Sequence, residues 1–279
     1  MSMGFSTGFS LCYSKIPVDR DMIETILFSE LDKFEISGEV FESDEFEEIY
    51  KKFFLVGKKL FSIHEIVPSN ISRNWSGTQD NIRKELVTHL KGKVKIAAEK
   101  GIKFFQIDLG LDTIKFGFEI QELNVRSALI APVLAEAEKY GITICHPIRF
   151  PKAFPSTQEW RFGTMLISSL LHRNFKLEVD AFPEEVSESK LHNLMKKLFY
   201  YPEVIRFRYE PALDGGISID KFRSWMDALG NQGFNGTVIF SPVFDSLDLL
   251  QDEMRRVNNL ISQYSSMQEE DMEIDKVYE

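Results

Sequence analysis

The chain repeats one unit: a short segment of β-branched and aromatic residues ends in charged residues, and the helical stretch after it usually closes in glycine. The clearest copies close at Gly101, Gly141 and Gly233, and each leads into the next β-rich segment. Glycine at that point supplies the left-handed conformation that ends a helix. Eight such units predict an α/β fold, a single (β/α)₈ barrel whose chemistry lies where the strands pass into the following helices.

The size of the chain fits one such domain. At 279 residues and 43% hydrophobic composition, it has the length that a single TIM barrel needs. We assign residues 1–268 to the barrel domain. We interpret residues 269–279, which are strongly acidic, as a solvated C-terminal tail.

Charge and composition argue against several classes of partner. Lysine and arginine number 33 against 43 acidic residues, so the net charge of -10 disfavours binding to a phosphate backbone, and we expect no nucleic-acid partner. No apolar stretch approaches the roughly 20 residues of a membrane span, so we expect no membrane partner. Cys12 and Cys145 are the only cysteines, and the amino terminus lacks a charged segment followed by an apolar one. These features predict a reduced, cytoplasmic protein.

Eight segments rich in β-branched and aromatic residues give the predicted strands. They are Phe5–Cys12, Phe34–Ser37, Phe61–Ile66, Ile102–Leu109, Ile142–Ile148, Phe175–Asp180, Val204–Tyr209 and Thr237–Pro242. Apolar residues at helical spacing predict helices over Asp44–Lys59 and Asn81–Glu99, and a last helix over Leu247–Tyr264. Pro132 interrupts the fourth helix, where we expect a bend.

Alternation along the strands predicts which side chains face the barrel axis. In strand seven, Ile205, Phe207 and Tyr209 suit the helix layer, which sends Arg206 and Arg208 toward the axis. The same division puts many polar side chains of the other strands on the axial side. They are Lys33, Glu35, Ser62, His64, Gln106, Asp108, His146, Lys176, Glu178 and Asp180. The sequence therefore predicts an unusually polar barrel interior.

Two interpretations of this interior remain open. Buried charges are disfavoured unless they are paired, so Arg206 and Arg208 could neutralise Glu178 and Asp180 in a structural lattice. The alternative is a ligand-binding mouth, since polar residues gather at the strand ends where barrel sites lie. The two overlap if the deeper residues are structural and the outer ones touch ligand.

Several short motifs resemble a known family. They are Met3-Gly4-Phe5-Ser6-Thr7, Leu31-Asp32-Lys33-Phe34-Glu35-Ile36, Ile63-His64 with Pro68 and Asn70, and Lys139-Tyr140-Gly141-Ile142-Thr143. Together they resemble the xylose-isomerase-like barrels, the sugar phosphate isomerase/epimerase group, in order over nearly the whole chain. The resemblance implies metal-assisted proton or hydride transfer on a sugar or related polyol. It also implies a metal held by glutamates ending strands five and eight and by an aspartate and a histidine at strand six.

The chain departs from that ligand pattern. Asp180 stands at the aspartate position and is the one candidate metal ligand, but Ala181-Phe182-Pro183 follows without a histidine. Ser241 replaces the glutamate of strand eight, and the glutamate of strand five falls at or beside His146-Pro147. We therefore expect a degenerate metal site and no resident cofactor, with a divalent ion (Mn, Zn or Mg) as the less favoured alternative.

Cations at the strand ends favour an anionic ligand. Guanidinium groups bind phosphate or carboxylate in pairs of hydrogen bonds, and Arg149 and Lys152 could join Arg206 and Arg208 at the rim. Trp75 offers either a stacking face for a sugar ring or an anchor for its own loop. The sequence thus predicts a small sugar or sugar-like anion as the partner.

Three function classes follow. The first is an isomerase or epimerase in which Glu35, His64, Asp108 or His146 serves as acid and base. The second is a non-catalytic barrel that binds the ligand without chemistry. The third is an abasic-site endonuclease, against which the acidic balance and the missing ligands count.

Overall fold

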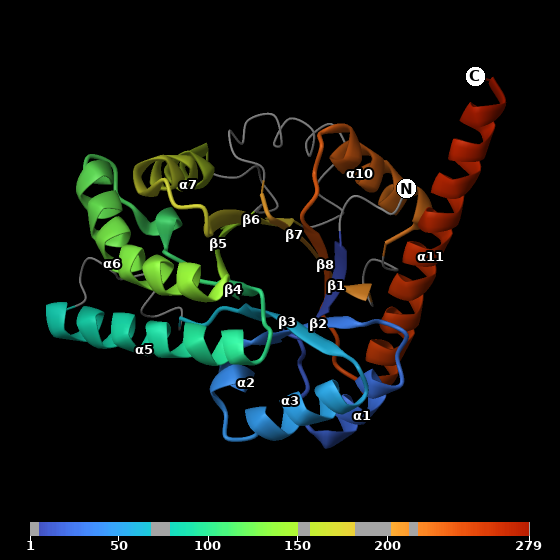
Figure 1. Cartoon of the computed structure of the whole chain (residues 1–279), viewed down its shortest axis with the longest axis horizontal. Coiled ribbons are helices and arrows are strands. Elements are labelled where there is room, and N and C mark those ends of the chain that lie inside the picture. Colours follow the sequence, from blue (N-terminus) through green and yellow to red (C-terminus); the bar gives the residue numbers. More distant parts are fainter. Residues whose placement is uncertain (1–5, 68–78, 150–156, 182–201, 212–216, 279) are drawn as a thin grey trace.

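The structure is a computed structural model that describes residues 6–67, 79–149, 157–181, 202–211 and 217–278. Within these residues a parallel sheet closes on itself in the order β1 to β8, with β8 paired to β1 (Figure 1). The strands are β1 Ser6–Ser10, β2 Lys33–Ser37, β3 Lys59–His64, β4 Phe104–Gln106, β5 Thr143–Arg149, β6 Phe175–Ala181, β7 Val204–Tyr209 and β8 Thr237–Pro242. The predicted TIM barrel is confirmed.

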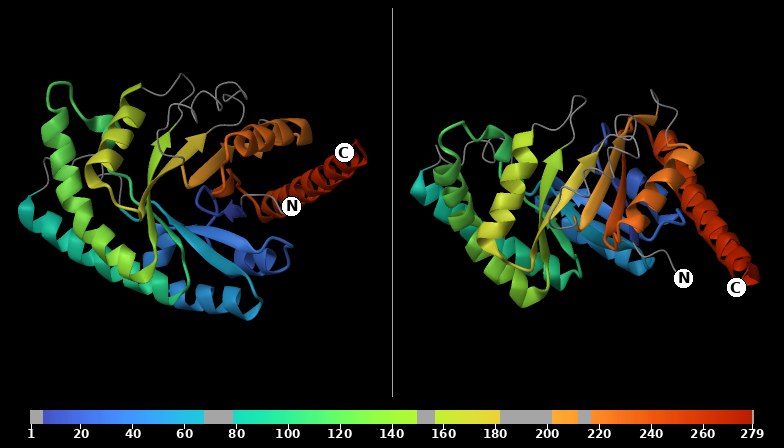
Figure 2. Two further views of the ribbon diagram at one scale, coloured as in Figure 1. Left: turned by 45° about the horizontal axis from the view of Figure 1, so that its top comes forward. Right: turned by 90° about the horizontal axis from the view of Figure 1, so that it is seen from above.

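Helices cover the outside of the barrel (Figure 2). They are α1 Arg20–Leu27, α2 Gly38–Glu42, α3 Phe46–Leu55, α5 Asp80–Glu99, α6 Glu119–Tyr140, α7 Thr157–Leu170, α10 Ile219–Asn231 and α11 Leu247–Tyr278, with a 3₁₀ turn η1 at Leu111–Thr113. No helix among the described residues is long and apolar enough to cross a membrane.

The predicted strands agree with the observed ones to within a few residues, apart from β4. That strand was expected over Ile102–Leu109 and spans only Phe104–Gln106, because the chain turns out of the sheet at Asp108. There the backbone N–H of Gly110 donates to the Asp108 carboxylate at 2.7 Å. The predicted last helix, Leu247–Tyr264, continues as α11 to Tyr278 and therefore includes most of the expected acidic tail.

The glycine positions behave as the repeat predicts. Gly101, Gly141 and Gly233 adopt φ values of 74°, 67° and 72°, the left-handed region that L side chains rarely occupy. Pro132 lies inside α6 as expected, where it can donate no backbone hydrogen bond.

The barrel interior has two layers. Near the amino ends of the strands, Phe61, Cys145, Val204 and Ile239 form an apolar cluster separate from the main core between sheet and helices. Alternation then places the next inward residues nearer the carboxyl ends, and these are polar. The apolar layer acts as a floor, and the polar layer lies between it and the open end.

Gly8 makes room for this floor. A Cβ atom added at Gly8 would lie 2.4 Å from Cζ of Phe61, closer than real Cβ atoms approach other atoms. The ring of Phe61 therefore fills the space that a side chain on β1 would need.

We predict that Gly8→Ala lowers the free energy of unfolding by about 1–3 kcal/mol, because the added methyl overpacks the floor. The added change Phe61→Leu should restore part of the loss. The matched control is Gly92→Ala, in α5, where nothing lies within 4 Å of the added carbon; it should be neutral or stabilising by about 0.5–1 kcal/mol. Denaturant unfolding measures all of these variants, and an unchanged Gly8→Ala protein would contradict the packing argument.

Candidate functional site

The deepest polar group of the barrel is an arginine between two glutamates. Arg206 on β7, Glu35 on β2 and Glu178 on β6 are all fully buried or nearly so. Arg206 donates to both oxygens of Glu35, with Nη2 to Oε2 at 2.8 Å, and its Nε donates to Glu178 Oε1 at 2.8 Å. This ion-pair layer joins strands from opposite sides of the barrel.

Hydroxyl and amide groups complete the hydrogen bonds of the layer. Ser10 Oγ donates to Glu35 Oε1 at 2.7 Å, and Ser62 Oγ donates to Glu35 Oε2 at 2.8 Å. Gln106 Nε2 donates to Glu178 Oε1 at 2.8 Å. Buried charged groups need such a complete set of hydrogen bonds, because an unpaired charge in an apolar interior is strongly destabilising.

The two glutamates differ in their expected charge. Burial acts to raise the pKa of Glu35, but the Arg206 charge and hydrogen bonds outweigh it and bring the pKa to about 2. Burial raises the pKa of Glu178 to about 7, because Arg206 offsets only part of that cost and the Glu35 and Asp180 charges add to it. Glu35 therefore stays ionised, while Glu178 titrates near neutral pH.

The lattice interpretation thus holds for Arg206 and its expected partner Glu178, and Glu35, which was not expected as a partner, binds the same guanidinium. Glu35 was expected to serve as an acid or base, but it is fully buried and bonded to Arg206 and two serines. These contacts make Glu35 part of the ion-pair layer that lies below the mouth.

The carboxyl ends of the strands form a second polar group, called the mouth here. It comprises Tyr13, His64, Glu65, Asp108, Arg149, Asp180, Arg208 and Ser241. The strand register brings members of this group together, since Arg149 pairs with Asp180 across β5 and β6, and Arg208 pairs with Ser241 across β7 and β8.

Some buried polar atoms of the mouth have no hydrogen-bond partner among the described residues, and two of them belong to an acid and a hydroxyl side chain. They are Asp180 Oδ1 and Ser241 Oγ, on side chains that are 3% and 0% exposed. Burial raises the pKa of Asp180 above its ordinary value, although Arg206 and Arg208 act in the opposite direction. Orphaned buried polar atoms are rare in folded proteins and mark places where a ligand or water is expected.

Tyr13 and His64 form a pair beside Arg208. The Tyr13 hydroxyl lies 3.1 Å from His64 Nε2, and the guanidinium carbon of Arg208 lies 4.1 Å from the Tyr13 ring centre. Burial, followed by the charge of Arg206, lowers the pKa of His64 well below its ordinary value. His64 is therefore neutral and able to exchange a proton through Tyr13.

Arg149 lies between two carboxylates. Its Nη2 is 2.9 Å from Asp108 Oδ2 and 3.3 Å from Glu65 Oε1. Burial acts to raise the pKa of Asp108, but His146 and Arg149 outweigh it and leave the pKa below its ordinary value. Asp108 is consequently an ionised partner of Arg149, which leaves it poorly suited to take up a proton.

His146 does not face the axis, and that expectation is wrong. Cys145 belongs to the apolar floor, so the adjacent His146 shares the helix-facing side with Ile144 and Ile148. Its Nδ1 accepts the backbone N–H of Leu109 at 3.2 Å, which supports the chain where it leaves β4. Burial lowers the pKa of His146 to about 4, so the ring is neutral.

The remaining expected site residues, Trp75 and Lys152, lie outside the described residues. Sequence reasoning did not identify Tyr13 or Glu65 as site residues. Tyr13 directly follows the segment predicted as strand one, and Glu65 lies inside the segment predicted as strand three, so position alone could have indicated both. Glu65 has φ of 51°, an uncommon value for a residue other than glycine.

The described residues do not fit a divalent metal site of the expected kind. No group of three or more histidine, cysteine, aspartate or glutamate side chains converges among them in a way that could hold an ion. Asp180 has arginines as neighbours, and at the strand-eight position Ser241 offers only a neutral hydroxyl. We therefore derive no chemical step through a metal.

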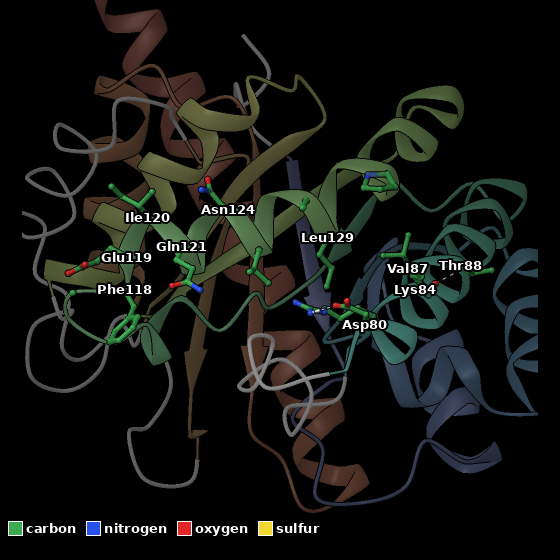
Figure 3. A pocket seen from close by; sticks show the side chains of 15 residues that line it. Asp80, Lys84, Val87, Thr88, Phe118, Glu119, Ile120, Gln121, Asn124 and Leu129 are labelled. Carbon is green, nitrogen blue, oxygen red and sulfur yellow. Dashed lines mark hydrogen bonds and ion pairs between the residues drawn. The ribbon is translucent and has the colours of Figure 1, made fainter.

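A separate groove of about 1110 Å³ lies on the outside of the barrel, between α5 and α6 (Figure 3). Val87 and Thr88 of α5 and Asn124 and Leu129 of α6 are among the residues that line it. The groove holds none of the buried titratable groups described above, so we place the candidate site at the mouth.

No family model and no curated protein sequence matches the chain. Solved structures are similar in fold. D-psicose 3-epimerase from Clostridium cellulolyticum H10, with D-tagatose, shares 17% identity over 94% of this chain and 96% of that chain, at a TM-score of 0.61. An L-ribulose 3-epimerase shares 15% sequence identity, with 95% of this chain and 97% of that chain covered, at a TM-score of 0.67. The 3-keto-D-glucoside 4-epimerase of E. coli shares 12% sequence identity, with 92% of this chain and 99% of that chain covered, also at a TM-score of 0.67. The chain thus has the xylose-isomerase-like barrel fold that the sequence motifs indicated.

We predict that Arg206→Met lowers the free energy of unfolding by about 3–5 kcal/mol, because it leaves two buried carboxylates without a counter-charge. Adding Glu35→Leu should recover part of the loss by removing one of them. Arg20→Met, in an exposed pair with Glu24, is the control and should change stability little. Denaturant unfolding of Arg206→Met that matches the parent would show that the layer is solvated.

We also predict a pH effect from Glu178. Its folded pKa of about 7 exceeds the ordinary value of 4.5, so folding takes up a proton between these values and stability falls as pH rises through them. Glu178→Gln removes this penalty and should gain roughly 1–3 kcal/mol relative to the parent between pH 5 and pH 8. Paired denaturant titrations at several pH values measure the difference; a constant difference across that range would contradict the raised pKa.

Proposed function

We propose that the mouth of the barrel binds a small, polyhydroxylated, anionic molecule of the sugar class, and that the protein acts on it as an isomerase or epimerase. The observation that carries the proposal is the pair of buried atoms, Asp180 Oδ1 and Ser241 Oγ, that have no hydrogen-bond partner among the described residues, at the end of the barrel where such folds place chemistry. Sugar hydroxyls both donate and accept, so they suit a carboxylate and a hydroxyl that lack partners.

The similar structures support the substrate class. Several of them are sugar 3- or 4-epimerases by name. Their similarity extends over nearly the whole of this chain, so the same barrel mouth is available for a sugar ligand here.

Asp180 is the proposed base. Its raised pKa makes the carboxylate a better proton acceptor than an ordinary aspartate. It removes a proton from the carbon beside the sugar carbonyl, and the electron pair moves to the carbonyl oxygen, where Arg208 stabilises the negative charge. Return of a proton from Tyr13, next to His64, to the opposite face of the same carbon gives the epimer. Return of a proton to the former carbonyl carbon gives the isomer, provided that the proton of the adjacent hydroxyl moves to the former carbonyl oxygen.

The other expected residues take supporting roles in this proposal. Glu35 and Arg206 hold the strands below the mouth, and Asp108 holds Arg149 at the rim. Trp75 and Lys152 remain proposed as a stacking face and an anion contact. We further propose that the reaction needs no resident divalent metal, which the donor set at Asp180 and Ser241 supports.

Deuterium incorporation tests the catalytic part. The metal-stripped protein is incubated in D₂O with ketoses, sugar acids and sugar phosphates, and NMR follows loss of the C–H signal beside the carbonyl. We expect exchange with at least one member of the panel and none with Asp180→Asn. The matched control is Asp252→Asn on α11, an exposed residue, which should exchange normally.

Thermal shift with the same panel separates the alternatives. Stabilisation without deuterium exchange would favour the second candidate function, a non-catalytic barrel that binds the ligand. The buried ion-pair layer is compatible with that function too, because it needs no chemistry at the mouth. Absence of both stabilisation and exchange would contradict the proposed function.

A further inference from the structure

Glu65 has an uncommon backbone conformation at the carboxyl end of β3. It directly follows His64, the last residue of that strand, and its φ of 51° lies in the left-handed region that residues other than glycine rarely adopt. Such strain persists only where the surrounding structure enforces it, and it is concentrated at binding and catalytic sites. The conformation of Glu65 therefore points to a role in function.

Two neighbours hold this conformation. The buried amide of Gln106 accepts the backbone N–H of Glu65 with Oε1 at 3.1 Å, while its Nε2 donates to Glu178 Oε1 at 2.8 Å, which fixes the orientation of the amide. On the other side, a Cβ atom added at Gly38 would lie 2.6 Å from Ile66 Cα and 2.7 Å from Glu65 O. The backbone at Glu65 is thus enclosed by β4 and α2 and anchored to the ion-pair layer.

The left-handed conformation brings the Glu65 side chain into the mouth. Strict alternation would place Glu65 on the helix-facing side with Ile63, and Ile66 on the axial side. Instead, Ile63 and Ile66 both belong to the main core between sheet and helices. The Glu65 carboxylate meets Arg149, with Oε1 3.3 Å from Nη2. The backbone at Glu65 therefore interrupts the alternation and supplies the mouth with a carboxylate that a regular strand would direct outward.

The ion pair with Arg149 does not account for this arrangement. Asp108 lies nearer to Arg149, with Oδ2 2.9 Å from Nη2, and already supplies a counter-charge. The Glu65 side chain is 47% exposed, and ion pairs with such exposure contribute little to stability. An exposed carboxylate in a binding site accepts charge-assisted hydrogen bonds from hydroxyl groups. A polyhydroxylated ligand supplies such donors.

Glu65 and the proposed base lie on different sides of the mouth. Asp180 is on β6, which is not a neighbour of β3 in the closed barrel. Burial raises the pKa of Tyr13, and the charges of Asp180 and Glu65 add to that rise, so both carboxylates act on Tyr13. A sugar whose reacting carbon lies at Asp180 then extends its other hydroxyl-bearing carbons toward the end of β3.

We propose that Glu65 is a specificity-determining residue that binds hydroxyl groups of the ligand on carbons beyond the reacting one. The residue selects sugars of full length over short carbonyl compounds with the same reacting group. The proposal rests on the proposed function, because it concerns the same mouth.

Replacing Glu65 by glycine should separate stability from specificity. We expect Glu65→Gly to keep or raise the melting temperature, by up to about 4 °C, because glycine adopts the left-handed conformation without strain. Thermal unfolding followed by circular dichroism measures this shift. A residue kept for a structural contact would give the opposite sign, so a melting temperature lower by more than about 4 °C would overturn the proposal.

Deuterium exchange in D₂O with matched probes measures the specificity. The pairs are D-fructose with dihydroxyacetone, and D-fructose 6-phosphate with dihydroxyacetone phosphate; the shorter member keeps the carbonyl and the C–H beside it. We expect Glu65→Gly to lower kcat/KM at least tenfold, and Glu65→Gln several-fold, for the six-carbon member that the parent exchanges. Exchange of its three-carbon counterpart should stay within twofold. The matched control is Glu47→Gln on α3, an exposed glutamate paired with Lys100, which should change neither.

An equal fall for both members of a pair would mean that Glu65 acts at the reacting carbon, and an unchanged kcat/KM for the six-carbon member would mean that it binds no hydroxyl. Either result would overturn the proposal and leave the proposed function standing. So would a parent that exchanges other members of the sugar panel but neither six-carbon ketose. A parent that exchanges no member of the panel would instead overturn the proposed function, and this proposal with it.

Discussion

The contact of Arg206 with Glu35 and Glu178 determines what the rest of the barrel interior can do. A cation enclosed by the sheet needs counter-charge from other strands, and β2 and β6 supply it from opposite sides of the axis. Because the apolar floor fills the space below, this layer separates a packed interior from a polar open end. The strand ends are thereby held in a fixed arrangement, which a binding site requires.

The same contact changes the electrostatics above it. Arg206 satisfies Glu35 most completely, while burial raises the pKa of Glu178 and also the pKa of Asp180, one inward position further along β6. The Arg206 charge offsets part of the rise at Asp180, so a structural cation acts on the pKa of a residue at the mouth. The lattice and the mouth, which the sequence left as alternatives, are successive layers of one interior.

Alternation in the sequence was sufficient for most of the deep layer. Arg206, Glu35 and Glu178 were placed on the axis because their strand neighbours are apolar, and the hydrogen bonds of Arg206 to both glutamates across the barrel confirm it. His146 was misplaced because its polarity was given more weight than its position. Ile142, Ile144 and Ile148 share its alternation and face the helices. Tyr13 and the partners of Arg149 depend on side chains that meet between distant strand ends, which no local pattern specifies.

The surroundings of Arg149 show why counting cations in a sequence misjudges an anion site. Arg149 was expected to bind the ligand, yet its guanidinium is already engaged by two carboxylates, those of Asp108 and Glu65. With three carboxyl groups around two arginines, the described mouth is less anion-attracting than its arginines suggest. A ligand that enters the mouth therefore meets the charge of its acidic residues as much as that of its basic ones.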